Sequence, residues 1–181
     1  GQADVAFSNE TWLNRIIFRD PNFLFNYSNI GYQTYLVEQE AVSLLKKLFF
    51  DGTRLGMAKA DMTETEPVIR NADMLTFDFS SVRMSDCPAA SFPSPNGFNG
   101  EDACQMMRYA GLSEKLTSIG LFELCPANDR DGMSAHLAAQ MIWYFIEGFS
   151  ARKGDDPHMN KAAFLKYIVS MVETQSDISF Y

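Results

Sequence analysis

Short apolar runs typical of strands alternate with segments of helical periodicity along this chain of 181 residues. The clearest runs are Met74–Phe79 and Leu116–Leu124, and a carboxylate interrupts each of them. Apolar side chains recur at helical spacing in residues 101–109 and 134–150. Strands that alternate with helices need crossover connections, which produce a mainly parallel sheet covered by helices on both faces. The sequence therefore predicts an α/β fold with three layers, α/β/α.

Shorter patterns predict the remaining elements. We expect helices in residues 11–18, 38–50 and 164–172, and strands in residues 23–27 and 54–56. The buried face of the helix in residues 134–150 is predicted to hold Leu137, Met141, Ile142, Phe145, Ile146 and Phe149. About four strands are fewer than the five or six of a typical sheet. We therefore expect residues 1–181 to be one piece of a larger domain.

Composition restricts the class of protein. With 46% apolar residues the chain can build a core, which excludes disorder. The net charge of −8 argues against nucleic-acid binding, because phosphate contacts need clustered Lys and Arg. No apolar stretch reaches the roughly 18 residues that a membrane span needs. Three unpaired cysteines suit a reducing compartment, so we expect a cytoplasmic protein without a nucleic-acid or membrane partner.

Two predicted strands end near a carboxylate flanked by apolar residues, Asp78 in one and Glu123 in the other. Ligands of parallel α/β sheets bind at the carboxyl ends of strands. Burying an ion costs several kcal/mol unless a cation or hydrogen bonds compensate. Each residue alone could be a structural anchor satisfied by loop N–H groups. Two of them at corresponding strand ends indicate a shared polar site, and the pattern leaves both interpretations open.

The order of motifs around these residues resembles the last third of the ureohydrolase superfamily, which includes arginase, agmatinase and formimidoylglutamase. The resemblance is carried by Asp78–Phe79–Ser80 through Pro88, the Ser94–Gly97 loop and Gly120–Pro126, and Ser28–Gln33 resembles the strand end that precedes this region. The match runs in order from about Phe23 to Gly148 and is most similar to bacterial formimidoylglutamase-like proteins. It implies the C-terminal part of an arginase-like α/β/α domain.

The resemblance also implies a pair of Mn²⁺ ions that activate a bridging water for attack on an amidine or guanidine carbon. In the family a strand supplies two Asp ligands at positions i and i+2. Here Asp78 is the first, and Ser80, a degenerate position, stands at the second. Glu123 matches the glutamate that faces the cationic group of the substrate. Arg83 is the second residue that we assign to ligand binding.

The other metal ligands of the family, an Asp-x-His-x-Asp motif and an earlier His, are expected upstream of this chain. His136 is predicted to be a packing residue of a helix, and His158 to be a solvated loop residue. Residues 8–14, where arginases carry a proton-shuttle His, contain none. We therefore expect this piece to be inactive alone.

Arg83 follows Ser80 by three residues and allows two interpretations. A fixed guanidinium could neutralise Asp78 in place of a metal ion. Alternatively, Arg83 is solvated or pairs with Asp86. Cys87 and Cys125 flank the same region, but no nearby His would activate either thiol as a nucleophile.

Two functions remain open at this stage. The first is a metal-dependent hydrolase of a linear amidine or guanidine, with a substrate of formimidoylglutamate type. The second is a non-catalytic relative that has lost the metal pair, as Ser80 and the missing shuttle His suggest, and that binds a small cationic ligand or a protein. A homo-oligomer is expected in either case, because the family usually forms one.

Overall fold

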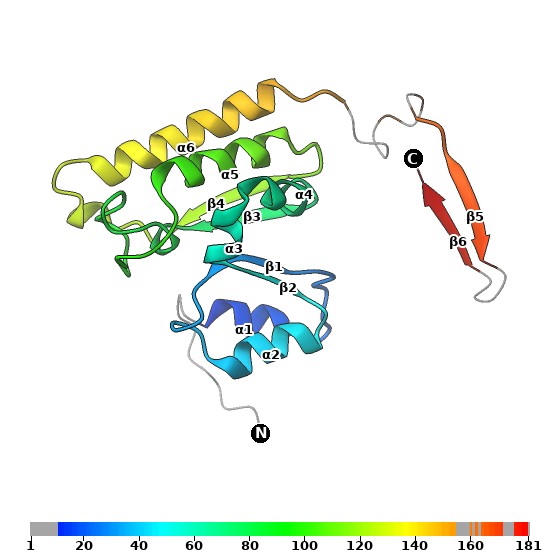
Figure 1. Cartoon of the computed structure of the whole chain (residues 1–181), viewed down its shortest axis with the longest axis horizontal. Coiled ribbons are helices and arrows are strands. Elements are labelled where there is room, and N and C mark those ends of the chain that lie inside the picture. Colours follow the sequence, from blue (N-terminus) through cyan, green and yellow to red (C-terminus); the bar gives the residue numbers. More distant parts are fainter. Residues whose placement is uncertain (1–10, 155–159, 161, 163, 172–175, 181) are drawn as a thin grey trace. The chain divides into compact units, whose positions relative to one another are not determined.

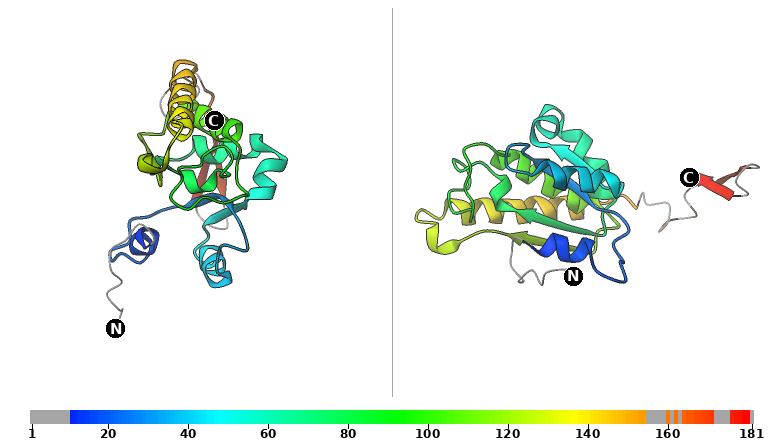
Figure 2. Two further views of the ribbon diagram at one scale, coloured as in Figure 1. Left: turned by 90° about the vertical axis from the view of Figure 1, so that its left-hand side faces the viewer. Right: turned by 90° about the horizontal axis from the view of Figure 1, so that it is seen from below.

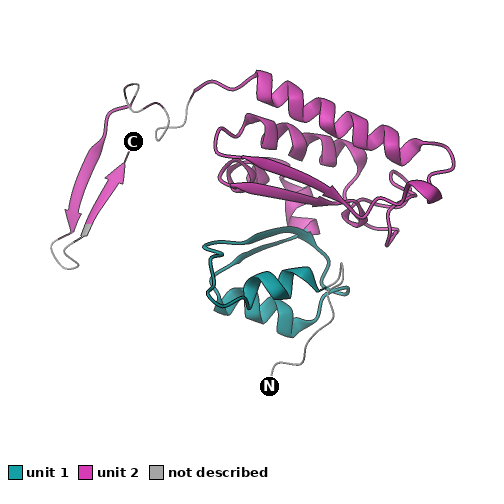
Figure 3. Ribbon diagram, turned by 180° about the vertical axis from the view of Figure 1, so that it is seen from behind, with its two compact units in different colours: residues 1–54 teal, residues 55–181 magenta. Residues whose placement is uncertain are grey.

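The structure is a computed structural model and describes residues 11–154, 160, 162, 164–171 and 176–180. The chain divides into two compact units, residues 1–54 and 55–181, which Figure 3 shows in different colours. Each unit is described by itself.

The first unit contains a β-α-β arrangement preceded by a short helix. Strand β1 (Ser28–Tyr32) pairs in parallel with β2 (Asp51–Arg54), and helix α2 (Gln39–Lys47) forms the crossover between them. Helix α1 (Trp12–Ile17) precedes β1. The register shifts near the end of β1, where Gly31 takes a φ of 99° that other residues rarely adopt.

The second unit repeats the arrangement with longer helices. Strand β3 (Met74–Asp78) pairs in parallel with β4 (Ser118–Phe122), and the crossover contains helix α5 (Gly100–Leu112). Helix α6 (Met133–Ser150) follows β4 (Figure 1). The smaller elements of this unit are α3 (Leu55–Ala60), η1 (Met62–Glu64), α4 (Thr65–Arg70), η2 (Phe79–Ser81) and η3 (Pro126–Asn128).

Helix α5 forms the centre of the core of this unit. Met107 and Ala110 are fully buried on it, and a capping box starts it: Asn99 Oδ1 accepts the N–H of Asp102, and Asp102 Oδ2 accepts the N–H of Asn99. Helix α6 runs beside α5 in each view of Figures 1 and 2. The two backbones approach closely at Gly111, where an added Cβ would lie 2.1 Å from a carbonyl oxygen of α6.

The last two strands form an antiparallel hairpin, β5 (Tyr167–Met171) and β6 (Ser176–Phe180). The predicted helix in residues 164–172 is therefore wrong. Val169 is paired with Ile178 of β6, so their side chains share one face of the hairpin. Within each strand, side chains at every second position point to the same face. Val172 lies outside the described residues.

Most other predicted elements are confirmed, within one to three residues at their ends. The structure has helices in place of 11–18, 38–50, 101–109 and 134–150, and strands in place of 74–79 and 116–124. The α/β class with parallel strands is likewise confirmed. The strand predicted for residues 23–27 is wrong, because pairing with β2 begins only at Ser28. In residues 54–56 only Arg54 belongs to a strand, and Leu55 begins α3.

The predicted burial of α6 is only partly right. Leu137 and Met141 are buried against the core and Phe145 is half-buried, whereas Ile142, Ile146 and Phe149 are exposed. His136 is exposed as well, so its prediction as a packing residue is wrong. His158 lies outside the described residues. Among the residues that the structure describes, no helix combines the length and the apolar character that crossing a membrane would require.

Candidate functional site

The carboxyl ends of β3 and β4 bring the two predicted carboxylates to one edge of the sheet. Asp78, the last residue of β3, is opposite Phe122, the last residue of β4, and Glu123 follows directly. Adjacent strands lie about 4.8 Å apart. The two acidic residues therefore leave neighbouring strands at the same level, as the sequence predicted.

Asp78 is fixed by the turn that follows its strand. Its Oδ1 accepts the N–H of Ser80 (2.7 Å), and its carbonyl oxygen accepts the hydroxyl of Ser81 (2.6 Å). Phe77 and Phe79 on either side are buried, whereas Asp78 itself is exposed, as the alternation of a strand requires. The expected burial of this carboxylate is wrong, so no large desolvation cost is attached to its charge.

Glu123 is half-buried and has an unusual backbone conformation. Its φ is 60°, in the left-handed region, where a side chain with a Cβ is strained. Hydrogen bonds on both sides hold it: the N–H of Ser91 donates to the carbonyl of Glu123 (2.8 Å), and the N–H of Cys125 donates to the carbonyl of Ala89 (2.8 Å). The loop before α5 therefore fixes the direction in which the Glu123 side chain leaves the strand.

The same loop also contacts Ser80. The N–H of Phe92 donates to Ser80 Oγ at 3.3 Å, so Ser91 and Phe92, neighbours in the chain, contact the ends of both strands. The sequence reasoning did not single out these two residues. The signal for them was the Ser-, Pro-, Gly- and Asn-rich segment of residues 91–100, because long loops beside strand ends often carry function.

Arg83 forms the pair with Asp86 that was one of its two predicted arrangements. Its Nε lies 2.8 Å from Asp86 Oδ1, and the described residues include no ion pair between Arg83 and Asp78. The hydrogen bond from Arg83 lowers the pKa of Asp86 from 3.8 to about 2, with further N–H support from Gly100. The guanidinium of Arg83 therefore pairs with Asp86 within the loop and does not neutralise Asp78. Its assignment to ligand binding stays a prediction.

The donor groups present do not by themselves fit a pair of Mn²⁺ ions. Asp78 provides one carboxylate, and Ser80 provides a hydroxyl that already accepts the Phe92 N–H. Divalent manganese prefers several carboxylate and imidazole ligands. Within the described ranges, no three His, Cys, Asp or Glu side chains lie close enough together to hold a metal ion. A metal pair would need ligands beyond these residues.

The cysteines are free thiols, as predicted. Cys87, Cys104 and Cys125 all lie among the described residues and form no disulfide. Burial raises the pKa of the Cys87 thiol, and the same cause raises that of Cys104. A thiol with a raised pKa is a poor nucleophile at neutral pH.

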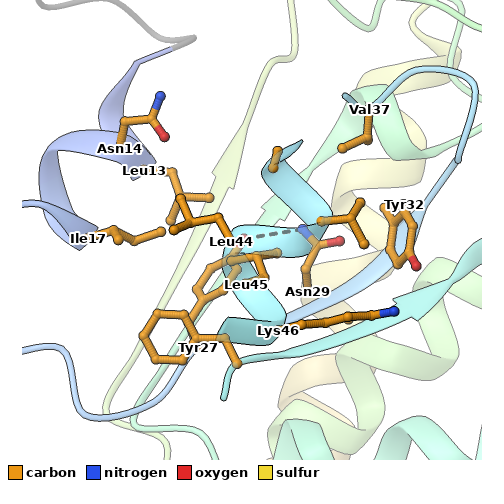
Figure 4. A pocket seen from close by; sticks show the side chains of 14 residues that line it. Leu13, Asn14, Ile17, Tyr27, Asn29, Tyr32, Val37, Leu44, Leu45 and Lys46 are labelled. Atoms are coloured by element: carbon orange, nitrogen blue, oxygen red, sulfur yellow. Dashed lines mark hydrogen bonds between the residues drawn. The ribbon is translucent and has the colours of Figure 1, made fainter. Parts of the chain in front are cut away.

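The first unit has an apolar groove with a volume of about 270 Å³. Most of the side chains that line it are apolar. Figure 4 shows Leu13, Ile17, Leu44 and Leu45 along it, from helices α1 and α2. Its polar contact is the hydrogen bond from Asn29 Nδ2 to the Tyr27 hydroxyl (3.2 Å), and burial raises the pKa of that Tyr. The described residues that line this groove include no Asp, Glu, His or Cys, so the strand ends of the second unit remain the better candidate.

Comparison with known proteins agrees with this fold. The family model described as "Arginase family" matches residues 15–147. A formimidoylglutamase from Enterobacter sp. (strain 638) is 29% identical over 102 residues, which are 56% of this chain and 31% of that protein. A crystal structure of Trypanosoma cruzi formiminoglutamase with Mn²⁺ superposes with a TM-score of 0.65 at 20% identity, covering 70% of this chain and 44% of the other.

Two further structures share the fold. A formimidoylglutamase from Bacillus subtilis gives a TM-score of 0.62 at 17% identity over 69% of this chain and 42% of that one, and the arginase from Bacillus caldovelox gives 0.58 at 17% identity over 65% and 42%. The chain spans about a third of the curated relative and less than half of each of these structures. The family match covers most of the chain, which belongs to the arginase family.

Proposed function

We propose that the ends of β3 and β4 form the cation-binding side of an active site, and that the whole protein hydrolyses a linear amidine of formimidoylglutamate type. The observation that carries the proposal is that Asp78 and Glu123 stand at the ends of neighbouring parallel strands at one sheet edge, with Glu123 in a strained conformation. Residues held in sparsely populated backbone conformations cluster at functional sites. The formimidoylglutamases among the relatives support the choice of substrate class.

The chemistry of this site is recognition of a positive charge. A carboxylate accepts two parallel N–H bonds from an amidinium or guanidinium group, and such charge-assisted pairs are about twice as strong as neutral ones. Glu123 would orient the cation, and the exposed carboxylate of Asp78 would add to the negative potential. A Mn²⁺ pair, where the whole protein holds one, would supply an activated water.

The test is turnover of N-formimidoyl-L-glutamate by the whole protein with Mn²⁺, followed by release of formamide. Glu123→Gln keeps the size of the side chain and removes its charge, and we expect a loss of about 10- to 100-fold in kcat/KM, from 1.5–3 kcal/mol per charged hydrogen bond. Glu64→Gln, an exposed carboxylate of η1, is the matched control and leaves kcat/KM unchanged. No turnover at saturating Mn²⁺ contradicts hydrolysis.

A second candidate is a binding protein without catalysis, and one observation favours it. Ser80 stands where the family's second Asp is expected, and its hydroxyl is already engaged by the Phe92 N–H. A neutral hydroxyl contributes far less than a carboxylate to holding a dication. Calorimetric titration of the whole protein with Mn²⁺ separates the two candidates. Under this candidate the native protein binds no Mn²⁺ and Ser80→Asp gains binding, whereas tight binding by the native protein refutes it.

We also propose that the protein associates with further copies of itself. Exposed apolar side chains of α6 support this, since Trp143 is 61% and Ile146 is 56% exposed. Patches of this kind often mark interfaces between proteins. Sedimentation velocity of the whole protein should show an oligomer, and a clean monomer at high concentration contradicts the proposal.

A further inference from the structure

The loop between β3 and α5 brings an aromatic residue, Phe92, next to the candidate site. Phe92 donates its N–H to Ser80 Oγ (3.3 Å), and the preceding Ser91 donates its N–H to the carbonyl of Glu123 (2.8 Å). Residues 91 and 92 therefore lie within hydrogen-bond distance of the ends of both parallel strands. Phe92 itself makes the first of these contacts, and the residue before it makes the second.

The backbone of this loop is fixed along its length. Ala90 forms an antiparallel bridge with Leu124, and the buried N–H of Ala89 donates to Ser134 Oγ of α6 at 3.0 Å. On the other side, the N–H of Met84 donates to the carbonyl of Ser94 at 2.7 Å. Segments held from two sides lose little entropy when a ligand binds, so the loop is suited to pre-organised recognition.

Phe92 differs from the apolar residues just before it. Ala89 and Ala90 are buried in the core, whereas Phe92 is 53% exposed. Exposing half of an aromatic ring forgoes part of the stabilisation that its burial would give. Half of this side chain is therefore accessible, on a residue whose backbone contacts Ser80 just beyond the end of β3.

Phe122 at the end of β4 is equally exposed, at 53%, but its ring lies elsewhere. A Cβ added to Gly120 would meet the Phe122 ring at 2.4 Å, so this ring is folded back along β4, away from Glu123. Phe122 therefore offers a comparison of equal exposure whose ring lies along β4.

We propose that Phe92 is a specificity-determining residue of this site and that its ring stacks on the planar cation of an amidinium or guanidinium ligand. The inference rests on the proposed function, because Asp78 and Glu123 supply the charge recognition that the ring complements. Planar, delocalised cations are weakly hydrated and stack on aromatic faces, while a carboxylate binds their N–H edge. A neutral amide of the same shape gains neither interaction to the same extent.

The experiment measures the affinity of the whole protein for acetamidinium and for its neutral isostere acetamide by ligand-observed NMR titration. Phe92→Leu keeps apolar bulk and removes the aromatic face, and we expect acetamidinium to bind about two- to five-fold more weakly, the range for an exposed cation–π contact. Acetamide binding stays unchanged, and Phe92→Tyr restores the affinity for the cation. Phe122→Leu is the matched control and leaves both affinities unchanged.

The outcomes separate this inference from the proposed function. If Glu123→Gln removes acetamidinium binding while Phe92→Leu does not affect it, the role of Phe92 is refuted and the proposed function stands. If Phe92→Leu weakens both ligands equally, or Phe122→Leu weakens acetamidinium as much as Phe92→Leu does, the ring acts only structurally and the inference is wrong. If the native protein binds no acetamidinium, both are refuted.

Discussion

Asp86 links the loop after β3 to the first turn of α5, and removing its charge tests how that loop is held. One carboxylate oxygen accepts hydrogen bonds from Arg83 Nε and the Ser85 hydroxyl, each at 2.8 Å. The other accepts the N–H of Gly100, the first residue of α5, also at 2.8 Å. Asp86→Asn keeps the size of the side chain but loses one acceptor and the negative charge. We expect the unfolding free energy to fall, since Arg83, Ser85 and Gly100 then lose a charged acceptor.

The pKa of Asp86 gives the magnitude. Its fall from 3.8 to about 2, caused first by the Arg83 hydrogen bond, corresponds to about 2.5 kcal/mol at 1.36 kcal/mol per pKa unit. The side chains of Arg83 and Asp86 are 44% and 22% exposed, so water screens the pair and this value is an upper limit. We therefore expect Asp86→Asn to cost about 1–1.5 kcal/mol at neutral pH.

The dependence on pH makes the prediction specific. A carboxyl whose pKa is lowered by folding stabilises the protein above the unfolded pKa, near 4, and this contribution is lost as the pH falls through the folded value, near 2. Urea unfolding of the whole protein should thus show a difference between native protein and Asp86→Asn that is full at pH 7 and small at pH 2. Asp131→Asn, an exposed carboxylate, is the control. A difference that does not depend on pH refutes the role of the charge.

Three further outcomes follow from packing and burial. Gly111→Ala should lower the unfolding free energy in urea by about 3 kcal/mol or more by forcing a Cβ against the α6 backbone, whereas Gly56→Ala in α3, with open space around it, should be neutral or stabilising. Asn99→Ala removes the N-cap of α5 and should lower the thermal midpoint, at a cost of about 1 kcal/mol. Alkylation with iodoacetamide at pH 8 should label the half-buried Cys125 before the fully buried Cys87, as mass spectrometry of peptides would detect.

The sequence predicted those elements whose hydrophobic period agrees with their tertiary environment. Helix α5 is buried along most of its apolar positions, so pattern and structure coincide there. The helix predicted for the segment that contains Tyr167–Met171 is wrong. Ile168 and Val169 fit either a helix or a strand, and only their pairing with β6 decides for the strand. The predicted burial of Ile142 in α6 is wrong, because a periodic pattern shows which residues are apolar but not whether another part of the protein covers them.

The candidate site was predictable in part for a related reason. Asp78 and Glu123 follow strands, and parallel strands end at one edge, so their meeting could be inferred from order alone. The contacts of Ser91 and Phe92 join residues 12 or more positions apart, and no local pattern encodes them. The choice of Asp86 as the partner of Arg83 depended on the loop conformation, and the sequence left it open.

The backbone of Glu123 gives the strongest argument that its side chain has a function. A left-handed φ costs a residue with a Cβ roughly 1–2 kcal/mol, and glycine at this position would avoid that cost. The Ser91 N–H holds the Glu123 carbonyl in place, so the surrounding loop maintains the strained conformation. A turn needed only to end β4 would be served by glycine at least as well. The proposed binding of a cation by the Glu123 carboxylate would account for this cost, and the loop that carries Phe92 holds the backbone of Glu123 in position.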